Sequence, residues 1–547
     1  MDSVITSHRQ PGDAERFRRR GIWGDRTLAE IAAVQADSHP DKVAVVDQHV
    51  RWTYADVIDK SLRAAQVLRE LGVGPGDRVA AQFPSCALVP LVHLAANWIG
   101  ALFIPVSDGW RRAEMGALLA TSSARVLVST ATRGSFDLRA MHKEIRPGLP
   151  GLRAVLYART EEEDSFERRL ESTSPLPTAE RARLRPDPDA PAHVMASSGT
   201  SGIPKAAAWG GNDLLTLLLH HFTTAIHLEA KDVAGGLAPS NVGSTGYVFP
   251  VLAALLTGAT SVILEEWSPP AALQLLTANR CTYATAIPTQ MTMLLSEPSL
   301  DELDLSAFTR FNNAGAPLPP HAAAEIERRM GCRVQTAYGA SDGGLPTLTS
   351  VDDPADKRLS TVGRPPIGQE LELRDPLGKP VAQGEEGEVW WRGANNSYGY
   401  VNQPDYEAAA WDDAGWYRSG DLGRIDDEGY LRITGRAKDM ILRAGTNIFP
   451  AEIENELHVH PAVADVAVVG VPHARLGEQA CAVVVTHGPT PPTLHDLLAF
   501  LTERGLAKFK HPEQLVIVEQ IPMNMGGKID RVELRRRVAE TSASTTN

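Results

Sequence analysis

Apolar and polar residues alternate along the chain in a pattern that predicts strands and helices in turn. Residues 42–47 (KVAVVD) and 78–81 (RVAA) are short apolar runs with the length of buried strands. Between them, five apolar residues recur at the spacing of one helix face, namely Ile58, Leu62, Ala65, Leu68 and Leu71. An apolar helix over 91–98 and an apolar run over 100–106 continue the alternation. Because strands and helices follow one another in this way, the sequence favours a mainly parallel α/β sheet.

The same alternation extends into the middle of the chain. We expect a helix over 212–228 and strands over 261–264 and 282–287. Two polar stretches interrupt it. Residues 1–20 are Arg-rich and predict a loosely held arm, and residues 161–188 are charged and Pro-rich, which predicts a surface connection. No repeat of fixed period is visible, which argues against solenoids and propellers.

A second pattern starts at about residue 438 and predicts a small α+β unit. Two apolar runs, one helix and one strand follow in order, at 463–471, 480–485, 494–504 and 515–519. A chain of 547 residues is long enough for more than one domain. We therefore expect a large N-terminal domain and a small C-terminal one.

Composition narrows the class of protein. Hydrophobic residues make up 43% and charged residues 22%, as in ordinary soluble proteins. A net charge of −13 argues against a general nucleic-acid binder. The widely spaced Cys86, Cys281, Cys332 and Cys481 predict free thiols in a reducing compartment rather than disulfides or zinc ligands. Without a signal-peptide core or an apolar run of membrane-spanning length, we expect a cytoplasmic protein with no membrane partner.

The most distinctive stretch is 197–205 (SSGTSGIPK), which follows an apolar run. Glycines let the backbone approach a ligand, backbone N–H and hydroxyl groups can surround an anion, and lysine adds a charge for phosphate. The spacing is not that of the common P-loop, and an ordinary flexible polar loop is the alternative.

Two later clusters offer complementary chemistry. Residues 312–317 (NNAGAP) and 338–342 (YGASD) supply close backbone approach, an aromatic face, a hydroxyl and a carboxylate. These groups suit a purine ring, a phosphate and a Mg²⁺ ion, which prefers oxygen ligands. Taken singly, each cluster could equally be a turn after a strand.

Five motifs in a fixed order resemble the adenylate-forming enzymes, which comprise acyl-CoA synthetases, peptide-synthetase adenylation domains and luciferases. They are the two stretches 197–205 and 338–342, and the segments 416–423 (WYRSGDLG), 435–454 (GRAKDMILRAGTNIFPAEIE) and 526–529 (GGKI). The resemblance spans roughly residues 25 to 535 and is closest to acyl-CoA synthetases of the cyclohexanecarboxylate and aryl-acid type.

The resemblance implies a fold and two domains. The fold class is α/β: a large N-terminal domain of α/β sheets with a distorted β-barrel subdomain, followed by a small mobile α+β C-terminal domain. The implied boundaries are 1–437 and 438–547, with Lys438 as the hinge.

The resemblance also implies roles for individual residues. Lys528 would bridge the carboxylate substrate and the α-phosphate, Lys205 would neutralise the outer phosphates, and Asp342 would hold Mg²⁺. Tyr338 would lie against adenine and Ser341 near the α-phosphate, while Asp421 and Arg436 would bind ribose. The remaining ligand-binding positions are Ser197, Ser198, Gly199, Thr200, Ser201 and Gly202 for phosphate, Gly315, Ala316 and Pro317 for adenine, and Gly445 for the pantetheine arm of CoA.

Three residues depart from the family pattern. Ser341 stands where threonine is usual, Asp342 replaces glutamate and shortens the side chain by one methylene, and Met525 replaces a threonine upstream of Lys528. We expect Asp342 still to serve the metal and Lys528 to keep its role.

The implied activity is an ATP-dependent carboxylic acid–CoA ligase that forms an acyl-AMP and then a thioester, with ATP, Mg²⁺ and CoA as cofactors. Small residues at the expected acid pocket suggest a bulky cyclic acid, although they could equally reflect backbone packing; they are Asn241, Val242, Gly243, Asn312, Gly343 and Gly344. A stand-alone adenylation enzyme that loads a separate acyl carrier protein is the first alternative, and a degenerate nucleotide-binding relative is the second. The sequence does not decide between a monomer and a homodimer.

Overall fold

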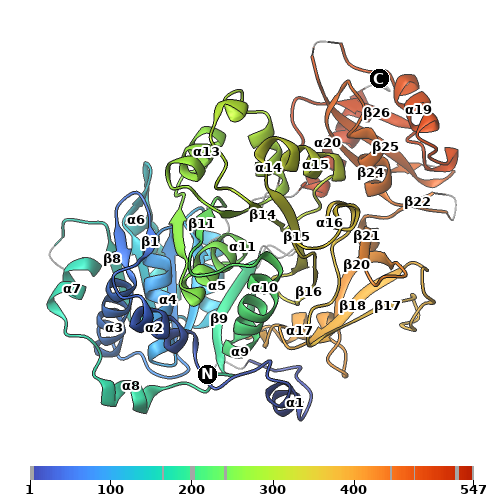
Figure 1. Ribbon diagram of the computed structural model, residues 1–547. Helices are drawn as coiled ribbons and strands as arrows, with labels where there is room; N and C mark the ends of the chain where they lie inside the picture. The colour runs from blue at the N-terminus through green and yellow to red at the C-terminus, as the bar shows by residue number, and fades with distance from the viewer. Residues whose placement is uncertain are drawn as a thin grey trace.

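Two mostly parallel sheets carry the N-terminal part of the chain, and a separate lobe at the C-terminal end holds the rest (Figure 1). The computed structural model describes residues 5–162, 165–197, 204–238, 243–443, 446–473, 475–488, 490–523 and 529–544. Across these ranges, no helix is long and apolar enough to cross a membrane.

The first sheet contains the strand that leads to the phosphate-loop segment. Over the described residues its order is β19 (Gly399–Tyr400), β10 (Lys205–Gly210), β9 (Pro191–Ser197), β4 (Leu102–Ser107), β3 (Arg78–Phe83), β5 (Val126–Thr130) and β8 (Ala154–Ala158). Strands β9, β4, β3, β5 and β8 run parallel, whereas β10 and β19 are antiparallel to their neighbours. A short hairpin, β6 (Thr132–Arg133) and β7 (Phe136–Asp137), lies outside this sheet.

The second sheet positions the adenine and metal motifs. Its order is β16 (Gly344–Leu348), β15 (Arg333–Ala340), β14 (Arg310–Ala314), β13 (Tyr283–Ala286), β11 (Val233–Gly236), β12 (Thr260–Ile263), β1 (Val43–Val46) and β2 (Arg51–Thr53). All neighbours are parallel except at the two edges. Because the strands are parallel, the 312–317 and 338–342 segments leave β14 and β15 at the same edge of the sheet.

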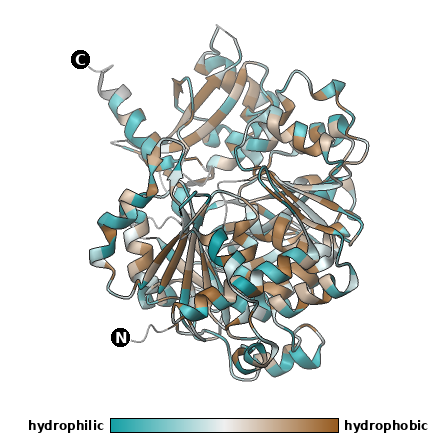
Figure 2. Ribbon diagram, turned by 90° about the vertical axis from the view of Figure 1, so that its left-hand side faces the viewer, coloured by the Kyte–Doolittle hydropathy of each residue, from teal (hydrophilic) through white to brown (hydrophobic). Residues whose placement is uncertain are grey.

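Helices cover both sheets. The first group is α2 (Leu28–Ser38), α3 (Tyr54–Glu70), α4 (Leu88–Trp98), α5 (Arg112–Ser122), α6 (Leu138–Ile145), α7 (Phe166–Ser172), α8 (Thr178–Leu184), α9 (Gly211–Leu215), α10 (Thr223–Ile226), α11 (Thr245–Tyr247) and α12 (Ala253–Thr257). The second group is α13 (Pro269–Ala278), α14 (Pro288–Leu295), α15 (Pro320–Met330), α16 (Ala355–Ser360) and α17 (Pro404–Ala410), and the 3₁₀ turns are 146–148, 300–302, 437–439 and 508–510. In Figure 2 most strands are brown, the colour of apolar residues, while the helices carry both apolar and polar residues.

The expected helix over 212–228 contains an unexpected segment. Between α9 and α10, residues Thr216–Phe222 (η2) form a π-helix, and a second π-helix, Val248–Leu252 (η4), joins α11 to α12. The predicted helical character is confirmed. The apolar spacing of the side chains, however, does not distinguish the i→i+5 hydrogen bonds of a π-helix from the i→i+4 bonds of an α-helix. Such segments are rare and often border functional sites.

A four-stranded antiparallel sheet completes the N-terminal domain at the place where a distorted barrel was expected. Its order is β17 (Gln369–Arg374), β18 (Gly387–Gly393), β20 (Tyr417–Ile425) and β21 (Leu431–Arg436). Trp391 and Tyr417 are buried there together with Tyr400.

The C-terminal lobe is a small α+β unit, as predicted. Its strands are β22 (Ile441–Arg443), β23 (Thr446–Ile448), β24 (Val463–His473), β25 (Gly477–Thr486) and β26 (Gln514–Ile517), and its helices are α18 (Pro450–Leu457), α19 (Leu494–Glu503) and α20 (Arg531–Ser544). The α/β fold class with a large N-terminal and a smaller C-terminal part is thus confirmed.

One prediction from polar composition is wrong, and a second polar stretch contains helices that its composition did not indicate. The arm is not loosely held: it forms α1 (Asp13–Arg19) and buries Phe17, while Arg9 pairs with the buried Asp213. His8 stacks on Trp411 with ring centroids 3.3 Å apart, and its Nδ1 lies 3.0 Å from Glu407. The 161–188 connection contains α7 and α8. In both stretches a few buried apolar residues, which charged neighbours outnumber, fix the structure.

Candidate active site

The phosphate-loop segment connects two paired strands. Ser197 at the end of β9 is in register with Lys205 at the start of β10. The two strands therefore hold the ends of the segment together and fix where the backbone of Lys205 lies. Of the predicted phosphate-binding positions, Ser198, Gly199, Thr200, Ser201 and Gly202 lie outside the described residues.

Lys205 and Asp342 meet although 137 positions separate them in sequence. The Lys205 Nζ atom donates to Asp342 Oδ2 over 2.8 Å. Two tyrosine hydroxyls complete the arrangement: Tyr400 donates to Oδ2 over 2.6 Å, and Tyr417 donates to Oδ1 over 2.9 Å. The structure thus brings together two predicted residues and adds two tyrosines to which the sequence assigned no role.

The electrostatics keep the Asp342 carboxylate ionised. Burial alone would raise its pKa, because only 8% of the residue is exposed. The charge of Lys205 and the hydrogen bonds from Lys205, Tyr400 and Tyr417 outweigh burial, so the pKa lies below its ordinary value. Burial and the Asp342 charge raise the pKa of both tyrosines, which stay protonated and donate.

A magnesium ion fits this carboxylate only with help from a ligand. Three hydrogen bonds use three of about four acceptor directions on Asp342, which leaves one on Oδ1. Within the described residues, no group of three His, Cys, Asp or Glu side chains could hold a metal. This donor set matches Mg²⁺ that is bound by one carboxylate together with phosphate oxygens and waters.

A second ion pair lies at the predicted ribose position. The Arg436 Nε atom is 2.7 Å from Asp421 Oδ1, and the Tyr338 hydroxyl donates to Asp421 Oδ2 over 2.7 Å. Asp421 and Arg436 are register partners on β20 and β21, which explains why the two charges meet. Three residues predicted to bind the nucleoside are therefore in direct contact.

The backbone around Asp342 is fixed from several sides. Trp209 donates its indole N–H to the carbonyl of Ser341 over 2.9 Å, and Trp391 donates to the carbonyl of Gly343 over 2.9 Å. A Cβ atom at Gly343 would lie 2.5 Å from the Tyr417 ring. Glycine at 343 therefore permits the close approach of Tyr417 to Asp342.

The adjacent turns also need glycine. Gly344 has a φ of +110° and lies against Asn395, and Gly315, which precedes Ala316 and Pro317, has a φ of +92°. L-residues with side chains rarely adopt such angles. These glycines set the path of the chain at the edge where β14 and β15 end.

On the expected acid side, a buried histidine joins two segments. His193 on β9 lies 2.9 Å, through Nε2, from the carbonyl of Gly243, and this ring nitrogen must donate because a carbonyl only accepts. His93 Nδ1 contacts the Tyr247 hydroxyl at 2.9 Å. Desolvation lowers the pKa of His193 to about 4, so the ring is neutral near pH 7. Asn241 and Val242 lie outside the described residues.

The predicted residues of the C-terminal part are only partly described. Lys438 lies in a 3₁₀ turn, Ala437–Asp439, between the four-stranded sheet and the C-terminal lobe. Gly445, Met525 and Lys528 are outside the described residues. Their roles stay predictions.

The sequence reasoning missed Tyr400, Tyr417 and His193. Tyr400 and Tyr417 are 58 and 75 positions from Asp342, and no local pattern reports such contacts. Tyr417 does stand in the 416–423 motif, which assigned it no role, and Tyr400 lies in a stretch rich in aromatic residues.

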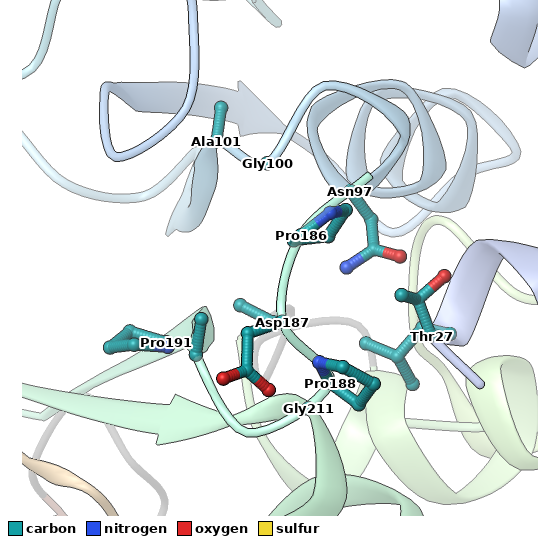
Figure 3. Close-up of a pocket in the computed structure, with 12 residues that line it drawn as sticks. Thr27, Asn97, Gly100, Ala101, Pro186, Asp187, Pro188, Pro191 and Gly211 are labelled. Atoms are coloured by element: carbon teal, nitrogen blue, oxygen red, sulfur yellow. The ribbon is translucent and has the colours of Figure 1, made fainter. Parts of the chain in front are cut away.

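A small cavity elsewhere offers no competing site. It lies between the end of α4 and the segment 186–188, and Thr27, Asn97 and Gly211 contribute to its lining (Figure 3). It has room for about one water molecule. None of the predicted site residues lines it.

Comparisons with known proteins agree with this geometry. Residues 32–401 match the model of the AMP-binding enzyme family, and residues 452–528 match that of the AMP-binding enzyme C-terminal domain. A medium-chain fatty-acid–CoA ligase of Escherichia coli (strain K12) is 33% identical over 538 residues, which cover 95% of this chain and 92% of the relative.

Two further relatives act on aromatic acids, according to their names. A 2-hydroxy-7-methoxy-5-methyl-1-naphthoate–CoA ligase of Streptomyces carzinostaticus is 33% identical, with 96% of each chain covered. A salicyl-AMP ligase / salicyl-S-ArCP synthetase of Mycobacterium tuberculosis (strain ATCC 25618 / H37Rv) is 32% identical, with 98% of this chain and 95% of the relative covered. The chain therefore belongs to the AMP-binding enzyme family of the adenylate-forming superfamily and is an AMP-forming acid ligase.

Proposed function

We propose that this protein is an AMP-forming carboxylic acid–CoA ligase that works in two half-reactions. The acid's carboxylate oxygen attacks the α-phosphorus of ATP, which gives acyl-AMP and releases pyrophosphate. The thiol of CoA then attacks the acyl carbon, the thiol proton passes to solvent, and AMP leaves. The observation that carries the proposal is the contact of Lys205 with Asp342 at the end of the phosphate-loop segment.

Charge and position account for most of the first half-reaction. Lys205 is the first residue of β10, directly after the phosphate-loop segment, so its ammonium can move from Asp342 to the outer phosphates and stabilise the leaving group. Mg²⁺, when bound, would neutralise phosphate charge beside Asp342. Tyr400 and Tyr417 hold that carboxylate in one orientation before the nucleotide arrives.

The nucleoside is assigned to the second ion pair. Asp421 can accept hydrogen bonds from the ribose hydroxyls while Arg436 pairs with its Oδ1 atom and the Tyr338 hydroxyl donates to its Oδ2 atom. Gly315, Ala316 and Pro317, at the end of β14, and the Tyr338 ring are assigned to adenine, with Ser341 beside the α-phosphate.

The C-terminal part supplies the remaining groups in this proposal. Lys528 holds the acid's carboxylate beside the α-phosphate during adenylation. The lobe then turns about Lys438, which removes Lys528 and brings Gly445 to the pantetheine arm. A hinge at Lys438 is supported by its position in a short turn between two sheets.

The acid and the acceptor are the finer parts of the proposal. We assign a bulky cyclic acid and CoA, which agrees with the name of the naphthoate–CoA ligase. The name of the salicyl-AMP ligase includes a carrier-protein synthetase, and this observation supports a separate acyl carrier protein as the second candidate acceptor.

Pyrophosphate release with ATP and Mg²⁺ across a panel of carboxylic acids, with and without CoA, tests the proposal. We expect release that depends on a cyclic acid and a CoA thioester that mass spectrometry detects. Release without a thioester would transfer the assignment to a carrier protein. If acetate or palmitate gave the highest kcat/KM, the assignment of a cyclic acid would be contradicted. If no acid gave pyrophosphate release, the second alternative, a degenerate nucleotide-binding relative, would be favoured.

A further inference from the structure

A row of three buried polar residues crosses the second sheet next to the proposed adenine position. Thr285 on β13, Asn312 on β14 and Gln335 on β15 are register partners, and each has an exposed fraction of 1% or less. Asn312 lies three residues before Gly315, and Gln335 lies three residues before Tyr338. At about 3.3 Å per residue, the row is therefore about 10 Å along the strands from the proposed nucleotide site.

The row faces the two π-helices. Successive residues of a strand point to opposite faces, so Tyr283, Ala314 and Ala337 share the face of the row. These three belong to one apolar cluster with Phe222 and Phe249, whereas Phe311 and Val334 on the other face pack with the helices α13 to α15. Figure 1 shows β14 and β15 between the α13–α15 helices and the helices around α10 and α11.

Aromatic rings connect the π-helices with this face. Phe222 of η2 and Phe249 of η4 stack with centroids 4.2 Å apart, and the edge of Phe222 meets Tyr283 at 5.8 Å. Segment η4 follows Gly243 and Tyr247, which are part of the expected acid side, and it packs against β11 and β13. The row thus borders the same region as the His193–Gly243 contact.

Two oxygen atoms of the row lack a partner in the part of the chain that the structure describes. The Asn312 amide donates to Thr285 Oγ1 over 3.3 Å, and the Gln335 amide donates to the carbonyl of Thr336 over 3.1 Å. Their acceptor oxygens, Asn312 Oδ1 and Gln335 Oε1, make no hydrogen bond. A buried acceptor without a donor costs free energy, and a native structure normally supplies that donor.

We propose that the acid carries a hydroxyl or amino group on its ring and that this group donates to the unpaired oxygens of the row: a hydroxyl, with one hydrogen, donates to Asn312 Oδ1 or Gln335 Oε1, and an amino group, with two, can donate to both. The inference rests on the proposed function, because it places the acid between the nucleotide site and the row. An acid that spans about 10 Å needs a ring system beyond its carboxylate, in agreement with a bulky cyclic substrate. A ring without such a donor would leave both acceptors unpaired, so the site selects against it.

Paired acids test this proposal in the full-length enzyme. The pairs are hydroxybenzoates with the matching toluates and hydroxynaphthoates with the matching methylnaphthoates, in which a methyl group replaces the hydroxyl at nearly equal size. The measurement is kcat/KM for pyrophosphate release. We expect the best hydroxyl-bearing acid to exceed its methyl partner by about 10-fold to 10⁴-fold.

Two variants locate the preference. Asn312→Leu and Gln335→Leu each replace an acceptor by an apolar side chain, and we expect each to raise kcat/KM for the methyl acid while lowering it for the hydroxyl acid. Such a gain distinguishes a specificity role from poor folding, and either variant alone is sufficient. Ser261→Ala is the matched control, since its buried hydroxyl on β12 also lacks a partner but lies beyond β11, away from the row.

The outcomes separate the two proposals. Two results would overturn this inference and leave the ligase assignment standing: equal kcat/KM for both acids of every pair, or a wild-type ratio of the two kcat/KM values in both variants. Either result would mean that the row binds only water. No pyrophosphate release with any acid would overturn the proposed function and this inference with it.

Discussion

Restoring glutamate, the usual family residue, at position 342 should harm this protein. The Asp342 carboxylate is held on both oxygens by Tyr400 and Tyr417, at 2.6 and 2.9 Å, and the residue is 8% exposed. One extra methylene moves the carboxylate by about 1.5 Å, which is half the length of these hydrogen bonds. The two tyrosines therefore suit an aspartate and leave no room for a longer side chain.

The size of the effect follows from the contacts. Inserting a methylene into a well-packed site costs about 1–3 kcal/mol of the free energy of unfolding. Lys205, whose side chain is 29% exposed, can follow the carboxylate, but the tyrosine rings cannot, because Tyr417 packs against Gly343 and Trp391. We therefore expect Asp342→Glu to lower the free energy of unfolding by about 1–3 kcal/mol.

Urea unfolding followed by tryptophan fluorescence measures this change without nucleotide. Asp352→Glu is the matched control, since it adds the same methylene to a side chain that is 64% exposed. In Asp342→Glu/Tyr417→Phe, loss of one hydroxyl opens space, so the double variant should be less destabilised than the sum of the single ones. Equal urea midpoints for wild type and Asp342→Glu, or strict additivity, would refute the fit that we infer.

Three further predictions concern the same site. The pKa of Asp342 lies below its ordinary value, so its ionised form stabilises the fold above about pH 4. This stabilisation is lost as pH falls through the pKa of the folded protein. Urea midpoints measured from pH 7 to pH 3 should therefore fall less in Asp342→Asn than in wild type. Asp421→Asn removes the charge that pairs with Arg436 and should raise KM for ATP by about 10- to 100-fold, whereas Arg418→Ala, an exposed change on the same strand, should not; equal KM values would contradict the ribose assignment. Lys528→Ala should lose pyrophosphate release yet still transfer a supplied acyl-AMP to CoA, and survival of both half-reactions would refute its role.

Local pattern in the sequence predicted many of the helices and strands but not the contacts between them. The strand at β1 and the helix α3 followed from apolar spacing, and the Thr53–Asp56 capping box fixes where α3 begins. The π-helical turns were not predictable, because the same apolar positions suit an α-helix. The wrong prediction of a loose arm and the unpredicted helices α7 and α8 both fall where charged residues outnumber a few buried ones, such as Phe17 and Phe166.

The candidate site divides in the same way. Motif order identified Lys205, Asp342 and Asp421, because each stands in a short segment with its own chemistry. The tyrosines around Asp342 and the Gly243–His193 contact depend on how distant strands meet, and a single sequence carries no signal for that. Motifs therefore indicated the residues that we assign to the nucleotide and metal, and only the fold showed which side chains contact them.

The packed arm has a consequence for how the protein is made. His8 reaches Glu407, 399 positions later, and the carboxylate of Glu407 in turn accepts a hydrogen bond from the backbone of Tyr400, whose hydroxyl holds Asp342. At about 5–20 residues per second, a ribosome needs roughly 20–80 s to supply that partner. Arg9 meets Asp213 about 200 positions earlier, but His8 and the Asp342 carboxylate both wait for the segment that holds Tyr400 and Glu407, so these two contacts form together and late in synthesis.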